Sequence, residues 1–289
     1  MRHLITSIVV IILFLGFTQD CLRAAVLSNS PDPVNAITIP GKKNQQNYKL
    51  FISLPDNYNP KKENGYPVLY VLDANGLFTL MTQVYDLLRL SNEVPEMIIV
   101  GIGYDVERFS DSFALRVSDL TPSRDIDEDR MLGSMYNSEV QSGGASYFLS
   151  AISESIIPHI DTHYNTNGTR ALAGFSLGGL FTTYALLNDN RIFTHYLIGS
   201  PSYWWDDGLI FRKEREFARK NNELPANVFI SVGSLEEELM IRPVKVMSQS
   251  LYNRKYKGLN LHTHIFENER HFSVIPATLS RGIRVLFSQ

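Results

Sequence analysis

Apolar residues along the chain recur in two patterns, which predict strands and helices in alternation. Residues 48–54 alternate apolar and polar positions, as a strand with one buried face does. Continuous apolar runs, typical of strands buried on both faces, occupy residues 67–72, 97–102, 171–173, 196–198, 228–232 and 261–266. Helical spacing fills the intervals, over residues 76–90, 145–164, 177–187, 209–221, 239–256 and 272–287. This order predicts an α/β fold with a mostly parallel central sheet and helices on both faces.

Residues 104–144 interrupt the alternation with a long polar segment that contains proline and several glycines. Long connections inside compact domains are usually functional. Ligands of parallel sheets bind at the carboxyl ends of the strands. We therefore expect this segment to be a loop that covers that edge of the sheet. Its acidic run, residues 125–129, is expected to be a solvated loop face rather than a cation site.

The first 25 residues have the layout of a secretory signal. A short basic start precedes an apolar stretch over residues 4–17, and the small residues Ala24 and Ala25 follow. The stretch is short for a membrane span. We expect cleavage near Ala24 or Ala25, export to the periplasm or the medium, and one domain over residues 26–289. An uncleaved membrane anchor and lipid attachment at Cys21 are the open alternatives.

Composition narrows the classes of function. The 289 residues include 44% apolar and 20% charged side chains, as an ordinary globular domain does. The net charge of -3 supplies no basic field for a nucleic acid. A single cysteine excludes an intramolecular disulfide and any cysteine-based metal cluster. We expect no nucleic-acid partner, no metal and no cofactor, and the sequence leaves the oligomeric state open.

A nucleophile motif follows the predicted strand at residues 171–173. Residues 174–179 read Gly-Phe-Ser-Leu-Gly-Gly and lead into a predicted helix. Gly-x-Ser-x-Gly between a strand and a helix is the nucleophile elbow, a turn so sharp that the serine takes a strained backbone conformation. The free N–H groups of the helix N-terminus favour developing negative charge. Ser176 is therefore the candidate nucleophile.

A serine hydroxyl needs a base, and chain order selects His271. In the fold that carries this elbow, the acid and then the histidine follow the serine along the chain. His271 comes after the last predicted strand and before the final helix. Strand or helix packing is the interpretation for the other candidates, which are His159, His163, His195, His262 and His264.

The acid that orients the imidazole is expected after the strand at residues 228–232. Glu236 is the first choice there. The alternatives left open are Glu237, Glu238, Asp206 and Asp207, or a dyad of serine and histidine alone. The oxyanion needs two N–H donors. We expect one from the backbone of Leu177 and the other from Asn75, to within one residue.

Blocks across the chain resemble the esterase family of α/β-hydrolases that includes enterochelin (siderophore trilactone) esterases and feruloyl esterases. The matching blocks are residues 66–73, 119–122, 142–149, 157–158, 174–180 and 200–205, together with Arg116, His271 and residues 281–282. The resemblance implies an α/β-hydrolase fold and metal-independent ester hydrolysis through an acyl-enzyme. It also implies that Arg116 contacts an anionic or phenolic substrate group, with a pair to Asp119 as the alternative. Trp204 and Trp205 line the pocket in this interpretation, or pack in the core.

The resulting hypothesis is an exported serine esterase that cleaves a small-molecule ester, such as a siderophore trilactone or a sugar-linked acyl ester. Two alternatives use the same scaffold: a non-catalytic binding protein, and an acyltransferase with the same residues.

Overall fold

The structure is a computed structural model that describes residues 36–41, 46–106, 109–188 and 192–287. The expected signal at residues 1–25, with Cys21, lies outside this part of the chain.

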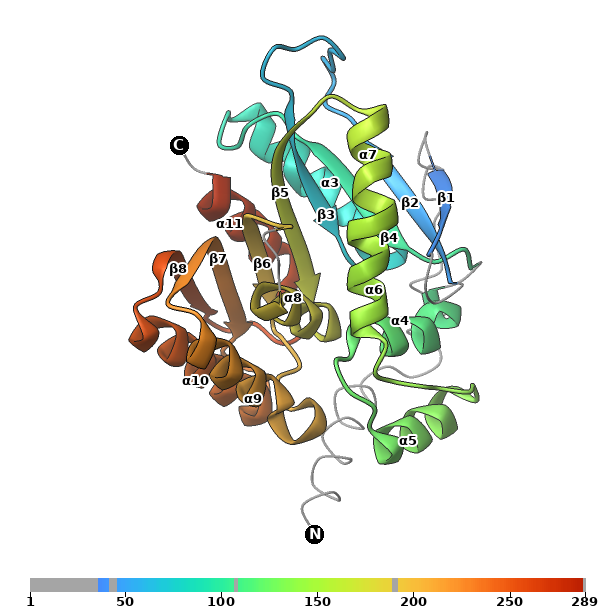
Figure 1. Cartoon of the computed structure of the whole chain (residues 1–289), viewed down its shortest axis with the longest axis vertical. Coiled ribbons are helices and arrows are strands. Elements are labelled where there is room, and N and C mark those ends of the chain that lie inside the picture. Colours follow the sequence, from blue (N-terminus) through green and yellow to red (C-terminus); the bar gives the residue numbers. More distant parts are fainter. Residues whose placement is uncertain (1–35, 42–45, 107–108, 189–191, 288–289) are drawn as a thin grey trace.

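A mixed sheet forms the centre of the described structure (Figure 1). Its strand order is β1-β2-β4-β3-β5-β6-β7-β8. Strand β2 pairs antiparallel with β1 and β4, and all pairs from β4 to β8 are parallel. The strands are β1 (Ala36–Pro40), β2 (Asn47–Ser53), β3 (Tyr66–Val71), β4 (Ile98–Gly103), β5 (Thr166–Phe175), β6 (His195–Gly199), β7 (Glu223–Gly233) and β8 (Lys257–Phe266). The predicted mostly parallel sheet is confirmed.

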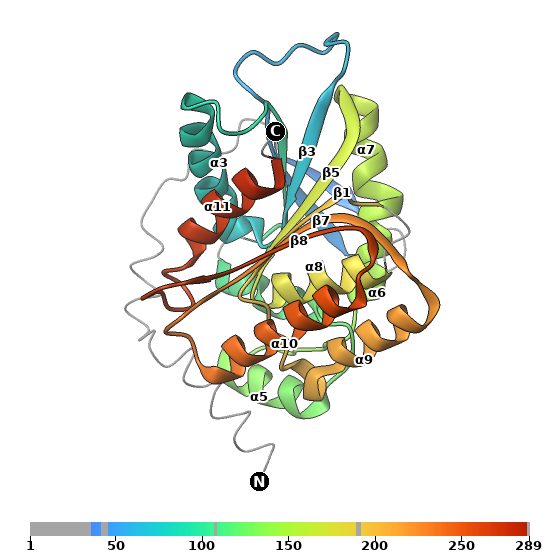
Figure 2. The same ribbon diagram turned by 90° about the vertical axis from the view of Figure 1, so that its left-hand side faces the viewer.

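Helices cover both faces of the sheet, as predicted (Figure 2). One face carries α3 (Ala74–Leu90) and α11 (Ile275–Phe287), and the other carries α6 (Ala145–Ala151), α7 (Ile157–His163), α8 (Leu177–Asn188), α9 (Trp205–Lys220) and α10 (Glu238–Arg254). Strand β3 links the two layers because its side chains alternate. Val68 and Tyr70 pack with the α8 side, whereas Leu69 and Val71 pack with α3.

Two predicted elements differ in detail. The helix expected at residues 145–164 is continuous, but its central turn η2 (Ile152–Ile156) is π-helical between α6 and α7. Strand β1 is not predicted by the apolar pattern, because its five residues are all exposed or half-buried at the sheet edge.

The segment at residues 104–144 lies at the carboxyl edge of the sheet, as expected, but it is not a plain loop. It contains the 3-10 turn η1 (Phe109–Ser112), α4 (Phe113–Leu120) and α5 (Ile126–Tyr136), below the ends of the strands in Figure 1. Asp125 caps α5 by accepting hydrogen bonds from the backbone N–H groups of Asp127 and Glu128 at 3.2 and 3.1 Å. We call residues 104–144 the cap segment.

The solvated face expected for the acidic run is wrong for two of its members. Glu128 and Asp129 are buried, because α5 turns them toward the cap segment's interior. Asp129 accepts the N–H of Ser142 at 2.9 Å and pairs with Arg124 at 3.4 Å. Within the described residues, no group of three or more acidic, histidine or cysteine side chains is arranged to hold a metal ion.

None of the helices in the described residues combines the length and the apolar character needed to cross a membrane.

Glu128 gives a test of this packing. Burial, followed by the charges of Asp125, Asp127 and Asp129, raises the pKa of Glu128 from 4.5 to about 7. The folded chain therefore binds this proton more tightly than the unfolded chain, and stability is lost as the pH rises from about 4.5 to about 7. We expect Glu128→Gln to raise the thermal unfolding midpoint at pH 8 and to have little effect at pH 4.

The matched control is Glu139→Gln, which alters an exposed carboxylate of the cap segment that is not among the charges acting on Glu128. It should not reproduce the pH-dependent gain. An equal gain for both variants, or a gain for Glu128→Gln that is independent of pH, would contradict the buried placement of Glu128.

Candidate active site

Ser176 occupies the turn between β5 and α8, with the strand, turn and helix that the motif predicts. Its φ of 59° lies in the left-handed region, which is costly for a residue with a side chain. The glycines permit the close approach that this turn requires. A Cβ at Gly179 would lie 2.8 Å from the carbonyl oxygen of Gly199, and one at Gly178 would lie 3.2 Å from Asp73 Oδ2. The elbow therefore depends on contacts with the neighbouring strand ends.

His271 and Glu236 are brought together from different strand ends. Glu236 follows β7 and His271 follows β8, and Glu236 Oε2 lies 2.7 Å from His271 Nδ1. Because Nδ1 faces the carboxylate, Nε2 is the ring nitrogen left for proton exchange. The imidazole is buried and packs on the ring of Phe175, the residue before Ser176, with 4.8 Å between the two ring centroids.

The other acids considered from the sequence are placed elsewhere. Glu237 and Glu238 are exposed at the N-terminus of α10. Asp206 and Asp207 lie at the start of α9, where Asp206 pairs with Arg212 at 3.7 Å. In the described part of the chain, Glu236 is the carboxylate that hydrogen-bonds His271.

The nucleophile's hydroxyl points to a second serine. Ser176 Oγ lies 3.3 Å from Ser202 Oγ, and among the described residues it makes no hydrogen bond to His271. Catalytic hydrogen bonds of free enzymes often form only when substrate is bound. The role of Ser176 as nucleophile, which requires its hydroxyl to turn toward His271 Nε2, stays a prediction.

The two expected oxyanion donors lie at helix N-termini. Leu177 is the first residue of α8, and Asn75 is the second residue of α3. Strands β3 and β5 are neighbours, so these helices begin at the same edge of the sheet. The Asn75 side chain is engaged elsewhere, since its amide donates to the Tyr104 carbonyl and its oxygen accepts the Tyr104 N–H. The backbone N–H of Asn75, or of its neighbour Ala74, is the group that remains.

Arg116 pairs with Asp73, so the alternative of a pair with Asp119 is wrong. The guanidinium donates from Nε and Nη2 to the two oxygens of Asp73 at 2.8 and 2.9 Å, and both side chains are buried. Burial alone would lower the pKa of Arg116, but the charge and hydrogen bonds of Asp73 outweigh it and raise that pKa. Asp119 instead accepts the hydroxyl of Tyr104 at 3.1 Å. A contact between Arg116 and substrate stays a prediction.

The two tryptophans have different surroundings. Trp205 is buried in the core, and its Nε1 donates to the carbonyl of Ser123 at 3.3 Å, which ties α9 to the cap segment. The core-packing alternative therefore holds for Trp205. Trp204 is half-buried against the same core, and its role in substrate binding stays a prediction.

Sequence reasoning missed Asp73, Ser200 and Ser202 as members of the site. Asp73 lies two residues beyond the end of β3, and Ser200 and Ser202 lie one and three residues beyond the end of β6. That position at the carboxyl edge was the available signal. Ser202 contacts the nucleophile, and Ser200 Oγ donates to Glu236 Oε1 at 2.6 Å.

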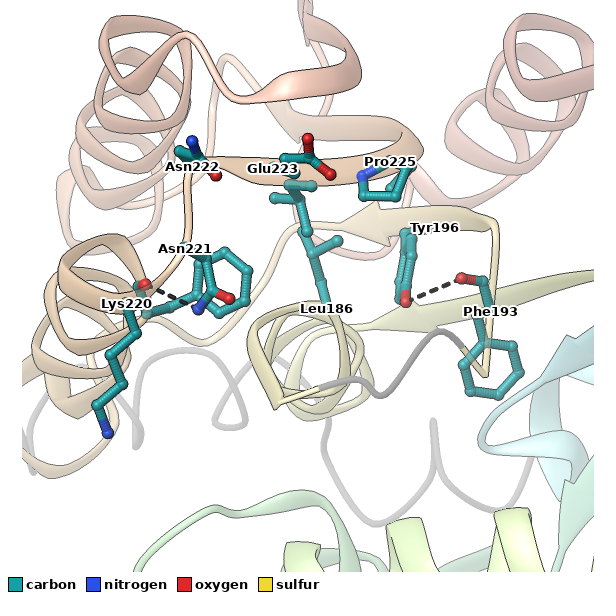
Figure 3. Close-up of a pocket in the computed structure, with 11 residues that line it drawn as sticks. Leu186, Phe193, Tyr196, Lys220, Asn221, Asn222, Glu223 and Pro225 are labelled. Atoms are coloured by element: carbon teal, nitrogen blue, oxygen red, sulfur yellow. Dashed lines mark hydrogen bonds between the residues drawn. The ribbon is translucent and has the colours of Figure 1, made fainter.

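A separate pocket lies at the opposite edge of the sheet (Figure 3). It has a volume of about 240 Å³ and is lined by residues from the end of α9 and the start of β7, among them Lys220, Asn221 and Glu223. Tyr196 lies in its wall and donates its hydroxyl to the carbonyl of Phe193. Because the nucleophile sits at the carboxyl end of β5, this pocket is no part of the site.

Comparison with known proteins assigns the family. A family model described as "Putative esterase" matches residues 41–274. The chain belongs to this family. The ferri-bacillibactin esterase of Bacillus subtilis is 32% identical over 272 residues, which cover 86% of the present chain and 91% of that relative. The siderophore enterobactin esterase of Emericella nidulans is 29% identical over 285 residues, which cover 86% of the present chain and 91% of that relative.

Solved structures agree with this assignment. The BES protein of Bacillus cereus matches with a TM-score of 0.77 at 30% identity, over 88% of this chain and 95% of that one. An IroE-like serine hydrolase of Shewanella oneidensis matches with a TM-score of 0.75 at 25% identity, over 88% of this chain and 79% of that one. The resemblance to esterases and the α/β-hydrolase fold are confirmed. The chain is a carboxylic ester hydrolase.

The contribution of the buried Arg116–Asp73 ion pair to stability can be tested by substitution. We expect Arg116→Met to lower the free energy of unfolding by about 3–5 kcal/mol in urea, because it leaves the Asp73 carboxylate buried without its cation. Combining it with Asp73→Asn should restore part of the loss. Arg130→Met, which removes an exposed cation from α5, is the control and should cost little.

The alternative role for Arg116 predicts the opposite pattern. Unchanged stability for Arg116→Met, combined with a raised KM, would mean that the guanidinium serves the substrate and that its pair with Asp73 is not structural.

Proposed function

We propose that the esterase cleaves its substrate through an acyl-enzyme, with Ser176 as nucleophile, His271 as base and Glu236 as the supporting acid. The observation that carries this is the 2.7 Å contact of Glu236 with His271 Nδ1, next to a serine held at positive φ on the elbow. The carboxylate fixes the tautomer in which Nε2 is free to accept a proton. No metal takes part in this chemistry.

In the first half-reaction, Ser176 Oγ attacks the ester carbonyl and its proton passes to His271 Nε2. Glu236 stabilises the imidazolium, and the N–H groups of Leu177 and of residue 74 or 75 stabilise the oxyanion. The alcohol then leaves with the proton from His271. In the second half-reaction, water gives a proton to His271 as it attacks the acyl group. Ser176 Oγ then leaves with that proton from His271, and the acid is released.

For the substrate we propose a siderophore ester. Support comes from the relatives, whose names include a ferri-bacillibactin esterase and a siderophore enterobactin esterase, each matched over 86% of this chain.

We also propose that residues 1–25 form a cleaved export signal, which leaves one domain over residues 26–289 in the periplasm or the medium. The support is the basic start, the apolar stretch and the small residues in the sequence. N-terminal sequencing of the protein from its native cells tests this, and an intact Met1 in the exported fraction would contradict cleavage.

The mechanism is tested with a panel of ferric-siderophore lactones, feruloyl and acetyl sugar esters, and a nitrophenyl ester. We expect Ser176→Ala and His271→Ala each to lower kcat by roughly 10⁴-fold or more on every ester that the parent cleaves, because the two residues act as a unit. The parent should be labelled at Ser176 by one equivalent of an organophosphate, and Ser176→Ala should not be labelled.

The matched controls are Ser248→Ala and His264→Ala, which alter residues of α10 and β8 outside the site. Both should keep the parent's kcat. Substantial turnover by folded Ser176→Ala would overturn the mechanism. A siderophore lactone cleaved less efficiently than the sugar esters would overturn the substrate proposal alone.

A further inference from the structure

Ser200 has an unusual backbone conformation for a fully buried residue. It follows β6 directly and has a φ of 36°, in the region that favours glycine. Such a conformation costs roughly 1 kcal/mol or more and persists where the surrounding structure enforces it. A glycine would adopt this conformation more readily. The presence of a serine here therefore indicates that its hydroxyl has a role that glycine could not fill.

That hydroxyl donates to the acid of the site. Ser200 Oγ lies 2.6 Å from Glu236 Oε1, and the N–H of Gly233 donates to the same oxygen at 2.8 Å. The other oxygen, Oε2, faces His271 Nδ1 at 2.7 Å. Hydrogen bonds therefore hold both oxygens of the Glu236 carboxylate in place, and such bonds are strong when the acceptor is charged. Without Ser200, the glutamate would be held at Oε1 by Gly233 alone.

The turn that carries Ser200 is itself fixed to both neighbouring strand ends. The Ser200 N–H donates to the Ser231 carbonyl of β7 at 2.8 Å, and the Ser176 N–H donates to the Gly199 carbonyl at 3.0 Å. Two residues on, the Ser202 N–H donates to the Ser176 carbonyl at 3.0 Å. The Ser200 hydroxyl therefore lies on a turn that is hydrogen-bonded through its backbone to the elbow and to β7, the strand that precedes Glu236.

We infer that Ser200 is a positioning residue of the ester hydrolysis, which acts by holding the Glu236 carboxylate in the orientation that supports the His271 imidazolium. This inference rests on the proposed function, and it goes beyond it by adding a fourth side chain to the site. Ser200 does not touch the reacting atoms in this role. Its effect on the rate passes entirely through Glu236.

A purely structural role makes a different prediction. Any buried hydroxyl needs a hydrogen-bond partner, so removal of Ser200 Oγ could affect stability alone. In that case the loss of activity would follow the loss of folded protein and would not depend on what stands at position 236. The two roles are separated by a double-mutant cycle between Ser200 and Glu236.

The experiment measures kcat and KM of the full chain for the nitrophenyl ester with the parent, Ser200→Ala, Glu236→Ala and the double variant. We expect Ser200→Ala to lower kcat about tenfold with KM changed less than twofold, the size of one charge-assisted hydrogen bond in the transition state. In the Glu236→Ala background, the same substitution should change kcat less than twofold.

Ser200→Gly is the second variant, because it removes the hydroxyl while fitting the left-handed backbone. It should fold at least as stably as Ser200→Ala and show the same loss of kcat. Ser231→Ala is the matched control. It removes an equally buried serine hydroxyl, bonded to Thr278 at 3.0 Å, and should keep the parent's kcat.

An equal loss of kcat from Ser200→Ala in both backgrounds would overturn the inference. So would parent-like kcat in folded Ser200→Gly, or in Glu236→Ala, while Ser176→Ala stays inactive. An equal loss in both backgrounds, or parent-like kcat in Ser200→Gly, removes only the role of Ser200. Parent-like kcat in Glu236→Ala removes the supporting acid as well, and leaves Ser176 and His271 as nucleophile and base. Turnover by Ser176→Ala would instead mark failure of the proposed function and of this inference with it.

Discussion

The close approach of backbone segments at the elbow is the constraint on which the rest of the site depends. Gly179 has room for no side chain because the carbonyl of Gly199 and the turn at Pro201 lie against it. This contact joins the start of α8 to the end of β6, and Ser202 and Ser200 lie beside Ser176 and Glu236 as a result. A strained serine is tolerated because its own N–H and carbonyl both bond to that neighbouring turn.

The parallel sheet then determines which residues can meet. Strands β3, β5, β6, β7 and β8 run in one direction, so their carboxyl ends share an edge. Asp73, Ser176, Ser200, Glu236 and His271 each follow one of these strands. The site is therefore assembled from five separate turns. Its precision comes from hydrogen bonds between turns, since no single segment holds more than one member of the proposed triad.

Much of this could be predicted from the sequence where the signal is local. Apolar runs of three to six residues predict most strands, and the elbow motif with chain order leads to Ser176 and His271. Two local signals failed. Strand β1 lacks a buried face, and the short helices α4 and α5 lie in a segment whose polar residues, proline and glycines indicated a loop. Contacts between distant residues were not readable. Arg116 and Asp73 are 43 positions apart in the sequence, and Ser200 and Glu236 are 36 positions apart. No sequence pattern around these residues indicates which distant residue each one pairs with.

The order of these turns along the chain has a consequence for biosynthesis. His271 comes from the last of these turns, and the helix that follows it, α11, packs beside α3 on the sheet. A growing polypeptide completes the elbow, the cap segment and Glu236 before the imidazole emerges from the ribosome. The proposed triad can therefore form only after residue 271 has been synthesised and β8 has paired with β7.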